Sequence, residues 1–121
     1  MPEQTVQIFG HERDAGTRAA VRFFKERRVP IHLVDITRKP IARGELRRFV
    51  ERLGARSLLD DASRAYRDGG LEYLRLDDAE LVERLLAVPA LLRLPLVRFG
   101  AELAAGRDAA AWKRWFKPAR A

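Results

Sequence analysis

Residues that commonly carry covalent or redox chemistry are scarce in this chain. It has no cysteine among its 121 residues, so the chain alone cannot form a thiolate, a disulfide or a covalent sulfur adduct. Its two serines, Ser57 and Ser63, lie outside any nucleophile-elbow pattern, and the chain has no glycine-rich phosphate loop. Its two histidines, His11 and His32, could hold a metal only with nearby carboxylates, and their spacing matches no known metal motif. The residue types therefore favour a binding protein over an enzyme, with no resident metal.

Several aspartates stand where helices are expected to begin. Asp14 precedes a helical pattern, and its carboxylate can accept from the free N–H groups of the first turn, an ordinary cap worth about 1 kcal/mol. The pairs Asp60-Asp61 and Asp77-Asp78 are adjacent in sequence, so we interpret them as caps rather than as acid–base pairs.

The formal net charge of +7 would suit nucleic acid, acidic proteins or small anions as partners. Twenty of the 24 basic residues are arginine, a skew that also indicates a bias of overall composition. Basic and acidic residues interleave between 43 and 52, which is typical of a solvated helix face. We therefore favour a solvated surface over a nucleic-acid site and keep nucleic-acid binding as an alternative.

An alternating α/β order of elements would position these residues. Residues 5–9 alternate and are rich in β-formers, and Gly10 ends that predicted strand. A helix follows the Asp14 cap and stops before Pro30. The apolar run 31–36 then predicts a second, buried strand, parallel to the first through a right-handed crossover.

Helices are predicted through the middle of the chain. Apolar residues at helical spacing indicate a helix over 46–53, and a short helical segment is expected to begin at Leu58. The poorly periodic stretch 66–74 is expected to pack onto the domain. Asp77, with Glu80 three residues later, forms a capping-box pattern that predicts the start of a further helix.

The last part of the chain predicts a β-hairpin and a helix. A strand entered through Pro95, a turn near Gly100 and a partner strand at 101–105 form the hairpin. A helix capped by Asp108 follows. Its aromatic residues are Trp112, Trp115 and Phe116. At helical spacing they share one face, which predicts docking onto the sheet rather than an aromatic, basic surface for nucleic acid.

We expect a single domain over residues 1–121. The chain has no internal repeat, linker or low-complexity segment, and no apolar run approaches the ~20 residues of a membrane span. The first residues lack the apolar region of a secretion signal, so we expect a cytoplasmic location and no membrane partner.

Several short motifs follow one another in a specific order. They are Ile8-Phe9-Gly10, Thr17-Arg18, Phe23-Phe24-Lys25-Glu26-Arg27, Val34-Asp35, Lys39-Pro40, Gly44-Glu45-Leu46, Ala65-Tyr66 and residues 91–98. In this order and spacing the chain resembles, over nearly its whole length, the bacterial glutaredoxin-dependent arsenate reductases and their Spx-type and YffB-like relatives. The resemblance implies a thioredoxin-like α/β fold with a four-stranded mixed sheet and a helical insert, and it makes Pro95 the family's cis-proline.

Members of that family carry a cysteine at the start of the first helix, a few residues before a Thr-Arg or Ser-Arg pair. Counting back from Thr17-Arg18, Asp14 stands at the position of that cysteine. A helix N-terminus stabilises a thiolate and binds an oxyanion through its free N–H groups and partial positive charge. A carboxylate there has no sulfur to oxidise, and its charge repels an oxyanion.

The resemblance also implies a ligand-binding groove between residues 10–18 and the Leu94-Pro95 strand entry. The candidate ligand-binding residues are Gly10, His11, Thr17, Arg18, Arg93, Pro95 and Arg98. Arsenate reductases have an arginine directly before the cis-proline, where this chain has Leu94, and another after a Leu-Leu pair, where it has Asp60.

Three functional hypotheses follow. The favoured one is a redox-inactive family member that acts as a binding or regulatory module; the Spx-type relatives imply RNA polymerase as a protein partner, and a small anion or glutathione is the alternative ligand. The second is an arsenate-reductase-like oxidoreductase whose thiol comes from bound glutathione or a partner glutaredoxin, since Thr17-Arg18 and Pro95 are retained. The third is a basic nucleic-acid-binding protein. No cofactor besides glutathione is expected.

Overall fold

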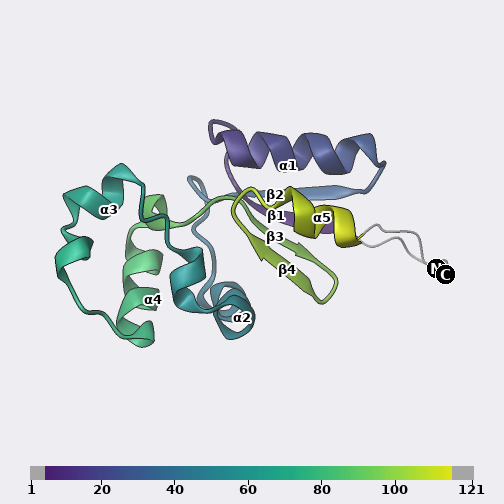
Figure 1. Ribbon diagram of the computed structural model, residues 1–121. Helices are drawn as coiled ribbons and strands as arrows, with labels where there is room; N and C mark the ends of the chain where they lie inside the picture. The colour runs from purple at the N-terminus through teal and green to yellow at the C-terminus, as the bar shows by residue number, and fades with distance from the viewer. Residues whose placement is uncertain (1–4, 116–121) are drawn as a thin grey trace.

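The computed structural model describes residues 5–115, in which helices cover both faces of a four-stranded sheet (Figure 1). Strands β1 (Val6–Gly10) and β2 (Ile31–Asp35) are parallel and are joined by helix α1 (Ala15–Glu26). Strand β3 (Leu96–Phe99) runs antiparallel to β1 and forms a hairpin with β4 (Glu102–Ala105). The sheet order is β2-β1-β3-β4, so β1 and β3 are central and β2 and β4 are the edges.

One face of the sheet packs against α1 and α5 (Ala109–Trp115). Ile8, Phe24 and Trp112 are fully buried there, and the Phe24 and Trp112 ring centroids lie 5.8 Å apart. Trp115 stacks on the Phe99 ring of β3, with the ring centroids 6.3 Å apart. The predicted docking of the last helix through its tryptophans is therefore confirmed, whereas Phe116 lies outside the described residues.

The opposite face packs against α2 (Arg43–Leu53), and the Phe9 and Phe49 rings meet edge to face at 6.0 Å. Beyond α2 the chain forms what we call the helical insert, residues 55–92. It contains the α-helices α3 (Arg64–Asp68) and α4 (Asp78–Ala87). Its 3₁₀ turns are η1 (Ala55–Leu58), η2 (Leu71–Tyr73) and η3 (Pro89–Leu91). Figure 1 shows the insert beside the sheet at the end where α2 lies.

The predicted βαβ start, middle helices, hairpin and closing helix all occur in that order. Asp14 caps α1, and Asp77 with Glu80 forms a complete capping box on α4. None of the described helices has the length and apolar character that crossing a membrane requires.

Two local predictions were wrong, and a third holds only in part. β2 is an edge strand rather than a buried one, because no described strand pairs with its outer side, and its His32 side chain is exposed. Leu58 ends a 3₁₀ turn instead of beginning a helix, and the next helix begins after a Ser63 cap. Within the stretch 66–74, Leu71 is buried but Tyr73 is 82% exposed, so this stretch packs onto the rest only in part.

The Asp60-Asp61 pair also differs from its predicted capping role. The Asp60 carboxylate accepts from the Ala62 N–H at 3.1 Å within a turn, while the Ser63 hydroxyl accepts from the Tyr66 N–H and caps α3. The serine stands closer to the first helical turn, so it takes the cap position.

Candidate functional site

The candidate site begins with the aspartate that caps α1. Asp14 has extended backbone angles, φ −84° and ψ 124°, and its Oδ2 accepts from the Thr17 N–H at 2.7 Å and from the Thr17 hydroxyl at 2.8 Å. Thr17 is only 1% exposed, so this carboxylate satisfies a polar group that water does not reach. The backbone N–H and the hydroxyl of Thr17 therefore both donate to Asp14.

Gly10 makes room for this arrangement at the end of β1. A Cβ on Gly10 would lie 2.1 Å from the Thr17 hydroxyl oxygen, far inside van der Waals contact. Only glycine lets the Thr17 side chain approach the strand so closely, which explains why the strand ends in glycine at this point.

The loop before β3 lies directly across from the start of α1. The Leu94–Pro95 peptide bond is cis. A Cβ on Gly16 would lie 2.9 Å from the Leu94 carbonyl oxygen, 3.1 Å from Pro95 Cδ and 3.3 Å from Asp14 Oδ2. Asp14 and Pro95 therefore lie on either side of the same small space. We call this region, formed by residues 10–17 and the Leu94–Pro95 loop, the Asp14 site.

Sequence reasoning missed two features of this site. Gly16 stands in the first turn of a helix, where glycine is unfavourable for entropic reasons. A glycine at such a position could have indicated that another part of the backbone approaches closely. The second feature is the backbone of Leu94, whose N–H and C=O have no hydrogen-bond partner among the residues that the structure describes. The residue types of a sequence do not reveal which backbone N–H and C=O groups will lack a hydrogen-bond partner.

His11 belongs to the loop that leads into α1, at the edge of the Asp14 site. Its Nδ1 is buried and has no partner within residues 5–115. Gly10 pairs with Asp35 in the sheet, so His11 lies near that carboxyl group. Two hydrogen bonds from Thr37 hold the pKa of Asp35 below its usual range, and the nearby Arg38 and His11 act in the same direction. The described residues contain no cluster of side chains that could hold a metal ion.

Of the three arginines expected at the ligand groove, only Arg18 lies at the Asp14 site. Its side chain is exposed on α1 and donates to the Glu12 carbonyl at 2.8 Å across the preceding loop. Arg93 turns away: its guanidinium donates to the Leu59 carbonyl at 3.1 Å, and its aliphatic stem lies against Gly106.

Arg98 lies on the other face of the sheet. It donates to Gln7 Oε1 at 2.6 Å and forms an ion pair with Glu45 of α2 at 3.1 Å. Side chains alternate along a strand, and the neighbours of Arg98 face α1, so Arg98 must face α2. The predicted positive lining of Arg93 and Arg98 is therefore not assembled.

Comparison with known proteins locates the chain among relatives. A model of the ArsC family matches residues 11–115. Two curated sequences described as arsenate reductase, from Neisseria meningitidis serogroups A and B, are each 31% identical over 110 residues, with 88% of this chain and 92% of theirs aligned.

Solved structures match over a similar extent. The YFFB (PA3664) protein superimposes with a TM-score of 0.78 at 24% identity, covering 88% of this chain and 97% of that one. An arsenate reductase from Vibrio cholerae gives 0.78 at 18% identity, covering 88% and 92%. These likenesses confirm the predicted thioredoxin-like α/β fold with a helical insert.

Proposed function

The chain belongs to the ArsC family, and from this premise we propose that it is a redox-inactive member that binds an extended segment of a partner protein at the Asp14 site. The observation that carries the proposal is the Asp14 carboxylate, which caps α1 where the resemblance implies a cysteine.

An aspartate in place of the cysteine removes the reductive step. Reduction of arsenate by a cysteine-based enzyme needs a thiolate that displaces hydroxide from arsenic, and a sulfur that a second thiol can then attack, so that the two thiols become a disulfide and supply two electrons to arsenic. A carboxylate can do neither, and none of the 121 residues is a cysteine. Any thiol would have to arrive from another molecule.

The Asp14 carboxylate also opposes the binding of an oxyanion. The Thr17 N–H of the first turn is already occupied by Asp14 Oδ2, so it is withdrawn from a bound anion. Two like unit charges ~4 Å apart at an effective dielectric of ~20 repel by about 4 kcal/mol, roughly a thousandfold in affinity. Arg18, exposed and bound to the Glu12 carbonyl, offsets only part of this repulsion.

The polar groups that the Asp14 site still offers are suited to binding a peptide. The Leu94 N–H and C=O lack partners among the described residues, and half-buried backbone groups gain free energy when an extended chain pairs with them. The negative charge of Asp14 next to that backbone favours a basic side chain on the bound segment. RNA polymerase, implied by the Spx-type resemblance, is one protein that could supply such a segment.

The first test is enzymatic. We expect no arsenate reduction above the buffer rate when the full chain is supplied with glutathione, glutaredoxin and arsenate. Turnover would overturn redox inactivity and would instead support an oxidoreductase that borrows its thiol.

The second test measures binding by backbone amide shifts of the isotopically labelled full chain. The probe is an acetylated, amidated peptide Val-Lys-Val-Thr-Val, with Val-Glu-Val-Thr-Val as its matched control. We expect shifts at residues 10–18 and 93–95 with the lysine peptide only. The variant Asp14→Asn keeps the helix cap but removes the charge, and it should weaken binding by about fivefold to tenfold. Equal shifts with both peptides, or shifts with glutathione or arsenate alone, would contradict the proposal.

A further inference from the structure

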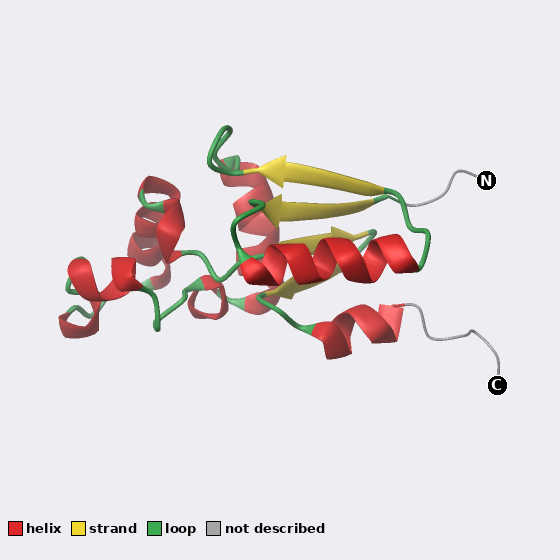
Figure 2. Ribbon diagram, turned by 90° about the horizontal axis from the view of Figure 1, so that it is seen from above, coloured by secondary structure: helices red, strands yellow, loops and turns green. Residues whose placement is uncertain are grey.

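The outer side of β2 is open. β2 is the last strand of the sheet, and within residues 5–115 Figure 2 shows no helix or strand beyond it. The Pro30 carbonyl accepts from Val6 at 2.9 Å and the Ile36 N–H donates to Gly10 at 3.0 Å, so the even-numbered residues face β1. Backbone groups alternate along a strand, so the N–H and C=O groups of Ile31 and Leu33 face outward. None of these four groups has a partner among the described residues.

A groove adjoins this open edge on the α2 side of the sheet. It has a volume of about 440 Å³. Phe9, Val34 and Ile41 contribute apolar surface to it, while Gln7 and His32 contribute polar atoms. α2 lies closest to β4, the opposite edge of the sheet, and reaches β1 through the Phe49–Phe9 contact, so it leaves the groove beside β2 uncovered. A strand added at the edge would hold every second side chain over this groove.

The open edge has basic residues at both ends. Arg28 precedes β2, and Arg38 and Lys39 follow it; all three are exposed. Residues 26–39 include four basic and two acidic side chains. Of the two acidic ones, the Asp35 carboxylate accepts hydrogen bonds from Thr37, which fix its position within the turn after β2.

A second copy of the chain is a poor occupant for this edge. Antiparallel pairing of two β2 strands would bring Arg28 of each copy toward Arg38 and Lys39 of the other. Parallel pairing would align each arginine with its own counterpart. Like charges placed together across an interface oppose association in both orientations.

We propose that the β2 edge binds an extended segment of another protein in which acidic residues flank a run of about five β-forming residues. The segment adds a fifth strand to the sheet through Ile31 and Leu33, places alternate side chains over the groove, and pairs its acidic ends with Arg28 and with Arg38 and Lys39. This interface adjoins the Asp14 site at one end, where Gly10 pairs with Asp35, but it lies along a different strand and has the opposite charge preference.

The test uses the labelled full chain and the acetylated, amidated peptide Glu-Glu-Val-Thr-Val-Thr-Val-Glu-Glu. The same peptide with glutamine in place of glutamate, which keeps the length and the hydrogen-bonding groups but carries no charge, is the control. We expect amide shifts centred on residues 31–35, slower hydrogen exchange at the Ile31 and Leu33 amides, and at least about tenfold tighter binding of the acidic peptide, declining as salt rises. Shifts centred on residues 10–18 and 93–95, equal affinity for the two peptides, or a concentration-dependent dimer without peptide would overturn the proposal.

Two variants make the assignment specific. The double variant R38E/K39E should weaken the acidic peptide by about tenfold, whereas R64E/R75E changes the net charge equally at exposed positions of the helical insert and should have little effect. Leu33→Pro removes an outward N–H without breaking a bond of the sheet, and it should abolish the slowed exchange. If Leu33→Pro fails to fold, the charge variants alone decide, and equal losses in both double variants would refute the interface.

Discussion

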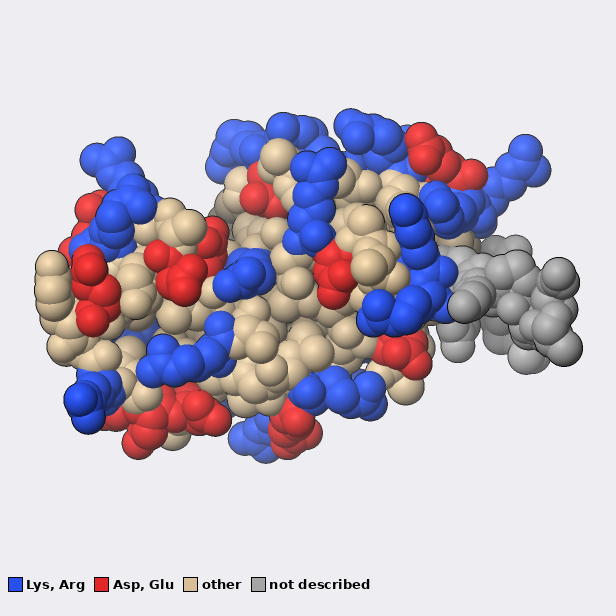
Figure 3. Space-filling model, in the orientation of Figure 1, with Lys and Arg blue, Asp and Glu red and all other residues tan. Residues whose placement is uncertain are grey.

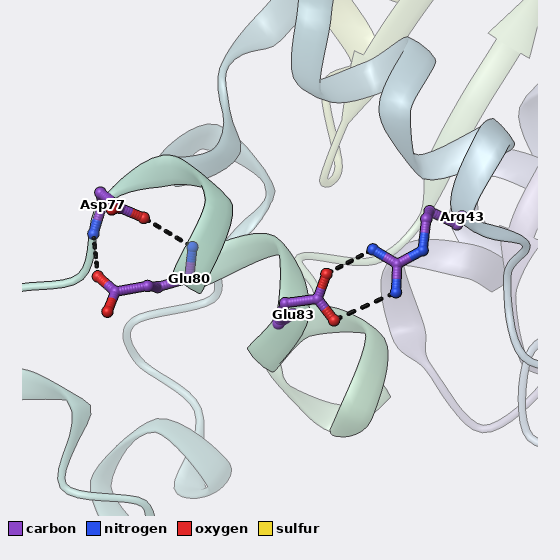
Figure 4. A network of polar contacts seen from close by, with 4 residues as sticks. All are labelled: Arg43, Asp77, Glu80 and Glu83. Atoms are coloured by element: carbon purple, nitrogen blue, oxygen red, sulfur yellow. Dashed lines mark hydrogen bonds and ion pairs between the residues drawn. The ribbon is translucent and has the colours of Figure 1, made fainter.

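Helices α1 and α4 both begin with an aspartate cap, yet only α1 begins at the candidate site. At α4 the cap is closed on itself: Asp77 Oδ1 accepts from Glu80 at 2.8 Å, and Glu80 Oε1 accepts from the Asp77 N–H at 2.9 Å (Figure 4). At α1 the cap is completed by a buried threonine, and the Leu94–Pro95 loop lies across from it. A capping residue therefore does not by itself mark a site; the element that faces the cap does.

The regions around these two helices also differ in charge. The helical insert, residues 55–92, carries eight acidic and five basic side chains, so the positive excess of the chain belongs entirely to the remaining residues. Figure 3 shows basic side chains gathered over α1, whereas blue and red alternate over the insert. The insert therefore carries a net charge of −3 and the other residues of the chain +10, so the protein is not uniformly basic.

The largest effect should come from filling the space that the α1 cap needs. Gly10→Ala should lower the free energy of unfolding by about 1–3 kcal/mol, because its methyl group would displace the buried Thr17 side chain from Asp14. Gly44→Ala is the matched control: nothing lies within 4 Å of its Cβ on α2, so alanine should stabilise by about 0.4–1 kcal/mol. Chemical denaturation of both variants measures the difference. If both variants behaved alike, the close Gly10–Thr17 contact would not exist.

The next largest effect should come from removing each aspartate cap, and the two variants should lose different amounts of stability. Asp14→Ala leaves the buried Thr17 hydroxyl and its N–H without an acceptor, which should cost about 2 kcal/mol of unfolding free energy. Asp77→Ala frees exposed groups that water can reach, so its cost should be about 1 kcal/mol. Chemical denaturation at neutral pH compares them. A larger loss for Asp77→Ala would show that the burial of Thr17 contributes nothing.

A cysteine at each cap should sharpen the comparison chemically. We expect Asp14→Cys to give a thiol whose pKa lies about one unit below the ordinary 8.5, because the α1 N-terminus stabilises a thiolate. In Asp77→Cys the Glu80 carboxylate lies beside the same cap and opposes the thiolate, so its pKa should stay closer to the ordinary value. The chain has no other cysteine, so alkylation by iodoacetamide across pH reports each thiol alone. Equal pKa values at the two caps would mean that Asp14 does not occupy a thiolate-stabilising position.

Much of the fold followed from local patterns. The caps at Asp14 and Asp77 and the hairpin turn at Gly100 each depend on residues close in sequence, which is why spacing alone predicted them. β2 was mistaken for a buried strand because its apolar run is the same in a central or an edge strand, and only the sheet order distinguishes them.

The candidate site was predicted only in part, for a similar reason. Gly10, Thr17 and Pro95 do lie around Asp14, as the resemblance implied: Thr17 donates to its carboxylate, Gly10 lies against Thr17, and Pro95 and Asp14 both border Gly16. Arg93 and Arg98 do not, because the direction of a side chain depends on strand register and on partners as distant in sequence as Leu59, Gln7 and Glu45.

The smallest effect should come from the ion pair that ties α4 to α2. Arg43 binds both carboxylate oxygens of Glu83 (Figure 4), and the Arg43 guanidinium holds the pKa of Glu83 below its usual range. Because the folded-state pKa is the lower one, the pair stabilises the fold above the ordinary carboxyl range, and its contribution is lost as pH falls through the folded-state pKa. Glu83→Gln should therefore be slightly less stable than the parent chain at neutral pH, and the difference should vanish in acid and in high salt. Glu72→Gln, at an exposed glutamate that forms no ion pair with another described residue, is the control and should show no such pH dependence. Both side chains of the pair are more than half exposed, so even the full effect must stay below that of either aspartate cap. A difference that persisted unchanged at acid pH would have to arise from packing rather than from charge.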